Sequence, residues 1–135
     1  MLNPNVPAWF EIPVADLDRA QAFYEGILDA TLARERIGEG ELAVFPYAGK
    51  PHASGALMAH PQMAPSMTGT TIYLSVDDVA PVLDRIARGA GEVLIPRTAL
   101  PDGMGVFAQF RDSEAIGSAC GRSSEVSPPA GDGGS

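Results

Sequence analysis

The segment WFEIPVADLDRAQAFY, residues 9–24, is expected to form a strand that turns directly into a helix. Its first half is rich in aromatic and β-branched residues, which favour strands. Asp16 or Asp18 can cap the helix, because a short carboxylate accepts hydrogen bonds from the first free backbone N–H groups. Residues at helical spacing then give the helix one apolar face: Leu17, Ala20, Phe23 or Tyr24, and Leu28.

A second strand–helix segment follows at an offset of 62 residues, where LSVDDV at residues 74–79 corresponds to IPVADL at residues 12–17. Each copy continues with a helix and then three strands. A β-α-β-β-β unit cannot bury both faces of its sheet alone, so two copies are expected to pack together. The repeat predicts an α+β fold with one module in residues 1–66, including a linker, and a second in residues 67–121.

The remaining elements follow from strand-forming runs between turn residues. The second helix is expected to be capped by Asp77 or Asp78 and to be stopped by Gly89 and Gly91. The Ser-, Pro- and Gly-rich residues 122–135 are expected to be a disordered tail. The expected strands are residues 30–36, 41–47, 54–59, 70–76, 93–95, 105–110 and a segment after Asp112, with a turn at residues 38–40.

Composition excludes several classes of protein. The net charge of −8 disfavours a nucleic-acid partner, because phosphates would be repelled. No apolar run approaches the ~20 residues that a membrane-spanning helix needs, and the start of the chain lacks the pattern of a signal peptide. The single cysteine, Cys120, suits a reducing cytoplasm. We therefore expect a cytoplasmic protein without a membrane or nucleic-acid partner.

The arrangement resembles the vicinal oxygen chelate superfamily, which includes glyoxalases, bleomycin-resistance proteins and extradiol dioxygenases. The resemblance covers about residues 6–120. Within the superfamily, the sequence is most similar to the small bacterial glyoxalase-like subgroup. It implies paired β-α-β-β-β modules, curved mixed sheets around a cleft, and a homodimer. The segments that carry it are FEIPVADLDRA at residues 10–20 with Phe23 and Tyr24, FP at 45–46, SGAL at 54–57, YLSVDDV at 73–79 and GVFAQFRDSE at 105–114.

The resemblance also implies four metal-ligand positions, two per module, and these align with Trp9, Leu57, Thr71 and Ala119. Divalent ions are bound by imidazole nitrogens and carboxylate oxygens. None of the four residues offers such a ligand, so we expect neither the metal of the superfamily nor another cofactor. A relocated site at His52 and His60 is disfavoured, because both flank prolines without an acidic partner at ligand spacing.

Without the metal, the cleft is expected to be lined by aromatic residues and a few polar groups. Strand alternation pairs Trp9 with Glu11 and Thr71 with Tyr73, so not every candidate faces inward. Such a lining suits a flat organic ligand. The alternative is that Trp9 and Phe45 simply fill the core. The candidate ligand-binding residues are Trp9, Phe45, Tyr47, Leu57, Thr71, Tyr73, Phe107 and Gln109.

Glu11 is the candidate catalytic residue, because a carboxylate in an otherwise apolar strand can act as a general acid or base. The alternative is an edge or interface residue paired with an arginine. Cys120 has no nucleophile pattern and is expected to be inert.

Two functions remain open. One is a binding protein like the drug-resistance members, and the other is a metal-free lyase or isomerase acting on a small carbonyl compound.

The C-terminal strand departs from the pattern of the superfamily after Glu114. Family members continue with Gly-Asn-Arg-Ile-Gly-Leu, whereas this chain has Ala115 and Ile116 at the turn, residues that tolerate positive φ poorly. One explanation is a frameshift. With suitable synonymous codons, loss of one G converts the family turn into the sequence from Glu114 to Gly121. This hypothesis is tested by sequencing the gene and aligning it with the genes of relatives that have the intact turn.

Overall fold

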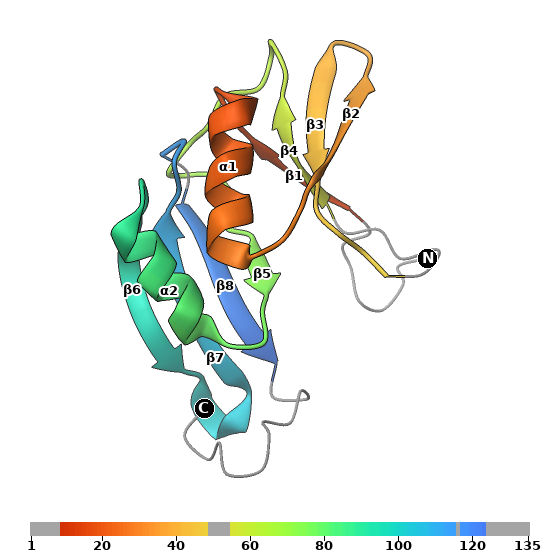
Figure 1. Cartoon of the computed structure of the whole chain (residues 1–135). Coiled ribbons are helices and arrows are strands. Elements are labelled where there is room, and N and C mark those ends of the chain that lie inside the picture. The colour runs from red at the N-terminus through yellow and green to blue at the C-terminus, as the bar shows by residue number, and fades with distance from the viewer. Residues whose placement is uncertain (1–8, 49–54, 116, 124–135) are drawn as a thin grey trace. The chain divides into compact units, whose positions relative to one another are not determined.

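The computed structural model describes residues 9–48, 55–115 and 117–123 of the chain. The chain divides into two compact units, Met1–Pro65 (unit 1) and Ser66–Ser135 (unit 2). Each unit contains one helix and one four-stranded mixed sheet, in the order β-α-β-β-β (Figure 1). The predicted α+β fold of two such modules is therefore confirmed.

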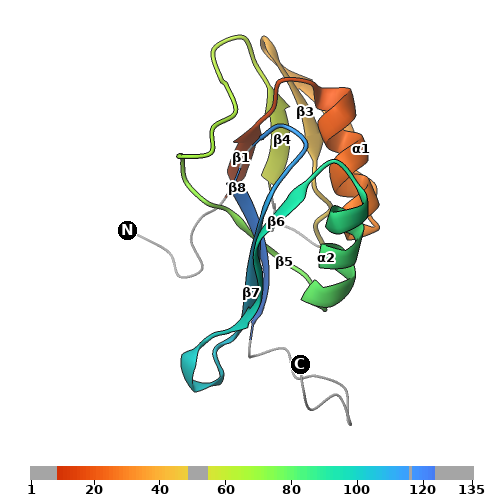
Figure 2. The same cartoon turned by 90° about the vertical axis from the view of Figure 1, so that its left-hand side faces the viewer.

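In unit 1 the sheet has the strand order β1-β4-β3-β2. Strand β1 runs parallel to β4, and the other neighbours are antiparallel. The helix lies on one side of this sheet and leaves the other side without a helix (Figure 2). The elements are β1 (Phe10–Pro13), α1 (Leu17–Leu28), β2 (Ala33–Ile37), β3 (Gly40–Val44) and β4 (Gly55–Ala59).

Helix α1 begins where the carboxylate of Asp16 accepts a hydrogen bond from the backbone N–H of Arg19 at 3.0 Å. Asp16, rather than Asp18, is therefore the N-cap of α1. The helix ends at Asp29, which has the left-handed conformation common at helix C-termini. The apolar face contacts the sheet through Leu17, Ala20, Tyr24 and Ile27, which are buried.

The core of unit 1 lies between α1 and one face of the sheet. Phe45 contacts Phe10, with ring centroids 5.7 Å apart, and Tyr24, with ring centroids 5.8 Å apart. The ring of Phe10 covers Gly55, where an added Cβ would lie 2.4 Å from a ring carbon. Gly55 therefore provides the space that this aromatic cluster needs. The opposite face of the sheet carries a second buried cluster, made of Leu42, Val44, Ala56 and Met58, with Met63 against it.

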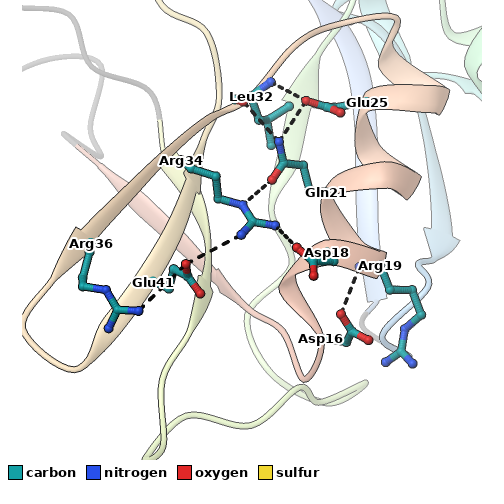
Figure 3. Close-up of polar contacts among 9 residues, drawn as sticks. All are labelled: Asp16, Asp18, Arg19, Gln21, Glu25, Leu32, Arg34, Arg36 and Glu41. Atoms are coloured by element: carbon teal, nitrogen blue, oxygen red, sulfur yellow. Dashed lines mark hydrogen bonds and ion pairs between the residues drawn. The ribbon is translucent and has the colours of Figure 1, made fainter.

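A polar network joins α1 to the exposed strand β2 and its neighbour β3 (Figure 3). The guanidinium of Arg34 on β2 contacts Asp18 and Gln21 of α1 and Glu41 of β3. Arg34 therefore links β2 to two other elements, α1 and β3. The network fixes a strand whose own side chains are all exposed.

In unit 2 the sheet has the order β5-β8-β7-β6, with β5 parallel to β8. Asp78 caps the helix, because its carboxylate accepts a hydrogen bond from the backbone N–H of Ala80 at 3.1 Å. A short 3-10 turn, η1 (Pro101–Gly103), precedes β7. The elements are β5 (Tyr73–Ser75), α2 (Val79–Arg88), β6 (Glu92–Ala99), β7 (Gly105–Arg111) and β8 (Gly117–Ser123).

Three strands of unit 2 differ by more than one residue from the expected bounds. Strand β5 covers only Tyr73–Ser75 of the predicted residues 70–76. Strand β6 runs from Glu92 to Ala99, beyond the predicted residues 93–95. Two register shifts against β7 allow this edge strand to contain Pro96. Strand β8 includes Arg122 and Ser123, which were assigned to the tail. The remainder of that predicted tail lies outside the described residues. Within the described residues, no helix is long and apolar enough to cross a membrane.

Candidate ligand-binding site

Two residues of unit 1, Trp9 and Glu11, lie beside one another at the start of the chain's first strand. The indole Nε1–H of Trp9 donates a hydrogen bond to the Glu11 carboxylate at 3.3 Å. Glu11 is in register with Ala56, so it lies on the sheet face opposite α1, as does Trp9 by strand alternation. Both side chains are exposed, Trp9 to 37%. The predicted pairing of Trp9 with Glu11 on one face is therefore observed.

Phe45 and Leu57 lie on the other face of this sheet. Phe45 packs against Phe10 and Tyr24, and Leu57, in register with Ile12, has no exposed surface. Their prediction as cleft-lining residues is corrected, because the pleat directs both side chains into the core beneath α1. Phe45 thus follows the core-filling alternative, whereas Trp9 does not. Tyr47 lies after β3 and is 57% exposed.

In unit 2 the structure brings three predicted residues together on the sheet face opposite the buried core of α2. Gln109 Nε2 donates a hydrogen bond to the Tyr73 hydroxyl oxygen at 2.6 Å. The rings of Tyr73 and Phe107 meet nearly edge to face, with centroids 6.1 Å apart. Tyr73 is 51% exposed, and Phe107 and Gln109 are half-buried. Thr71, two residues before Tyr73, is exposed.

This grouping depends on the strand register. Tyr73 on β5 and Gln109 on β7 both pair with Ala119 of β8, so one intervening strand separates them. The sequence placed Tyr73, Phe107 and Gln109 in one candidate set but did not reveal their contacts. Alternation within each strand could predict that Phe107 and Gln109 share a face. It could not predict which residues of β5 and β7 lie opposite each other, because alternation carries no information on strand pairing.

The cysteine lies on the helix-bearing side of the same sheet. Cys120 is fully buried, and burial raises the pKa of its thiol to about 11. A thiol with this pKa stays protonated near neutral pH, and the thiolate is the reactive form. The geometry therefore supports the expectation that Cys120 is inert.

Residues 7–115 match the family model described as Glyoxalase/Bleomycin resistance protein/Dioxygenase superfamily. The chain belongs to this superfamily. No curated protein matches the chain at a significant level. The predicted resemblance is thus confirmed at the level of the superfamily.

Solved structures agree with this assignment at the level of the fold. A glyoxylase/bleomycin resistance protein/dioxygenase domain from Frankia sp. EAN1pec has a TM-score of 0.64 and 23% identity, over 90% of this chain and 93% of that chain. A glyoxalase family protein from Bacillus cereus has a TM-score of 0.60 and 17% identity, over 91% of this chain and 99% of that chain. Glyoxalase I from Zea mays has a TM-score of 0.61 and 18% identity, but the match spans only 45% of that chain.

The metal positions of the superfamily can now be tested against the register. In unit 2, Tyr73 pairs with Ala119, so the β8 position aligned from sequence is in register with the face of Tyr73. In unit 1, Glu11 pairs with Ala56, whereas Leu57 points into the core. The offset of 62 residues between the modules therefore becomes 63 in their last strands, and Ala56 replaces Leu57 as the second metal position of unit 1.

The residues at these positions do not fit a metal ion. Trp9, Ala56 and Ala119 have no side-chain ligand for a divalent cation, and Thr71 contributes only a neutral hydroxyl. Across residues 9–48, 55–115 and 117–123, no three His, Cys, Asp or Glu side chains are grouped as metal ligands would be. His60 Nδ1 accepts a hydrogen bond from the backbone of Gln62 at 3.0 Å, and His52 lies outside the described residues.

Proposed function

We propose that this member of the superfamily binds a small aromatic or carbonyl-containing organic molecule without the metal site of the superfamily. The observation that carries the proposal is the cluster formed by the exposed Tyr73 with the half-buried Phe107 and Gln109. Aromatic rings provide apolar contact area for a flat molecule, while a hydroxyl and an amide fix its orientation by hydrogen bonds. Trp9 offers a further exposed aromatic surface in unit 1.

The binding role needs no reactive group, which fits the residues at the metal positions. The aromatic side chain of Trp9 and the small side chain of Ala56 can contact a ligand but cannot polarise it as a metal ion would. The proposal also includes a homodimer and a cytoplasmic location. The homodimer rests on the resemblance, and the location on the single buried Cys120.

A metal-free lyase or isomerase acting on a small carbonyl compound is the second candidate. Glu11 supports it, because its carboxylate is exposed and is oriented by the indole N–H of Trp9. An accessible carboxylate with a fixed orientation can take a proton from carbon next to a carbonyl group and return it elsewhere. The expected catalytic residue in this candidate is Glu11 alone.

Native mass spectrometry of the purified protein is the first test, because it reports bound metal, co-purified ligand and subunit number together. The binding proposal predicts a metal-free dimer, with any extra mass belonging to a small organic compound. A stoichiometric divalent ion would contradict it. Binding of candidate compounds can then be followed by the fluorescence of Trp9, the single tryptophan of the chain.

The Glu11→Gln variant separates the two candidates once a ligand is identified. The amide keeps the shape of the side chain but cannot exchange a proton as a carboxylate does. Under the binding proposal, affinity is retained within a few fold. Under the enzyme candidate, turnover falls by about 10²–10⁴-fold. The variant Glu39→Gln, in the exposed turn between β2 and β3, is the matched control.

A further inference from the structure

The hydrogen bond between Gln109 and Tyr73 has a defined direction. The Nε2 group of Gln109 is the donor, and an amide nitrogen can only donate. The Tyr73 oxygen therefore accepts this bond and keeps its own O–H proton for another partner. Among the described residues, this is the hydrogen bond that the Tyr73 hydroxyl makes. Because Tyr73 is 51% exposed, the free proton is available to a molecule arriving from solution.

The fold itself does not need this polar pair. In unit 1, Val44 pairs with Ala56 as Gln109 pairs with Ala119 in unit 2. Likewise Leu42 pairs with Met58, as Phe107 pairs with Gly121. At these equivalent positions unit 1 has a buried apolar cluster. The same sheet position thus accepts an apolar side chain, and a half-buried amide there contributes something other than packing.

The surroundings of the hydroxyl favour a ring with an attached oxygen. Phe107 lies against Tyr73 and provides an apolar surface next to the hydroxyl. An apolar body contacting Phe107 while its oxygen meets the Tyr73 proton would satisfy both groups together. A ligand hydroxyl can also accept this proton, but it exposes a donor of its own that a carbonyl group lacks.

We propose that Tyr73, with its oxygen held by Gln109, donates a hydrogen bond to the carbonyl oxygen of a flat aromatic ligand that rests against Phe107. Tyr73 and Gln109 are then the residues that determine specificity for a carbonyl group. This inference rests on the proposed binding function and names the chemical class of its ligand as aryl carbonyl compounds.

The experiment compares two probes of the same shape, 1-indanone and indane, of which only the first has a carbonyl oxygen. Protein NMR titration with each probe gives the dissociation constants and follows the side-chain amide signal of Gln109. The wild-type protein is expected to bind 1-indanone about threefold to tenfold more tightly than indane, which is the usual contribution of one hydrogen bond. The Tyr73→Phe variant is expected to lose this preference while its affinity for indane is unchanged.

A second variant, Gln109→Glu, keeps the Tyr73 ring and reverses the polarity of the pair. A carboxylate only accepts hydrogen bonds, so it takes the Tyr73 proton and leaves none for the ligand. Its preference for 1-indanone is expected to disappear, whereas the exposed control Gln62→Glu, with the same charge change, keeps it. An unchanged preference in Tyr73→Phe and Gln109→Glu would overturn the inference and leave the binding function intact. Failure of both probes to bind the wild-type protein would overturn the proposed function itself.

Discussion

At the scale of single residues, the backbone and the side chain conflict at Ala115. This residue lies in the turn between β7 and β8 and has a φ of 61°. Asp29 and Asp102 also have positive φ, but short polar side chains tolerate this region better than alanine does. The conflict agrees with the expectation from sequence that alanine is poorly suited to this turn. Ile116, the other residue of that expectation, lies outside the described residues.

The variant Ala115→Gly is expected to raise the free energy of unfolding by about 1 kcal/mol, because glycine adopts positive φ without a steric penalty from Cβ. Chemical denaturation measures the change. The control Ala87→Gly places the same substitution in helix α2 at an exposed position. It is expected to lower the free energy of unfolding, since glycine is unfavourable inside a helix. Equal effects at both sites would contradict this account.

At the scale of elements, Glu25 ties the end of α1 to the segment that leads into β2. Its carboxylate accepts hydrogen bonds from the backbone N–H of Leu32 at 2.8 Å and from Gln21 Nε2 at 3.1 Å (Figure 3). The bond from Leu32, and then that from Gln21, hold the pKa of Glu25 below its usual value of 4.5, with a smaller contribution from the charge of Arg34. The carboxylate is thus stabilised in its ionised form in the folded protein.

This lowered pKa predicts a pH dependence of stability. The contribution of Glu25 is fully present above pH 4.5, where the group is ionised in the unfolded chain, and is lost as the pH falls through the lower folded-state pKa. The Glu25→Gln variant is therefore expected to unfold at a lower temperature than the wild-type protein at pH 7. The difference between the two is expected to shrink below pH 4.5. Thermal unfolding between pH 3 and pH 7 checks this, and a difference that grows on acidification would refute it.

At the scale of the whole molecule, two units of the same topology differ in chemistry on equivalent sheet faces. Unit 1 has a buried apolar cluster bordered by the exposed Trp9 and Glu11. Unit 2 has a partly exposed cluster in which the hydroxyl of Tyr73, the amide of Gln109 and the ring of Phe107 are in contact. Superfamily membership accounts for the shared topology but not for this difference, so specific recognition is expected to reside mainly in unit 2.

Metal ions are expected to leave the stability of the whole protein unchanged. A metal at 100 times its dissociation constant stabilises a native protein by about 2.7 kcal/mol, which would raise the melting temperature by several degrees. Because no such site is expected, addition of Zn²⁺ or Ni²⁺, or removal of metals with EDTA, should shift the melting temperature by less than about 1 °C. Differential scanning calorimetry makes the measurement. A saturable increase in the melting temperature with one ion would contradict this prediction and indicate a metal-dependent member of the superfamily.

The sequence by itself determined the order of elements, the repeat of the module and the class of helix caps. These depend on local periodicity and on hydrogen bonds between residues close in the chain, as at Asp16 and Asp78. The tertiary structure alone decided which side chains share a face. Ala56, and not Leu57, lies on the sheet face of Glu11 in unit 1. In unit 2, Tyr73 and Gln109 contact each other across an intervening strand. The physical reason is that strand register is set by pairing between distant segments, and a shift of one residue moves a side chain to the other face.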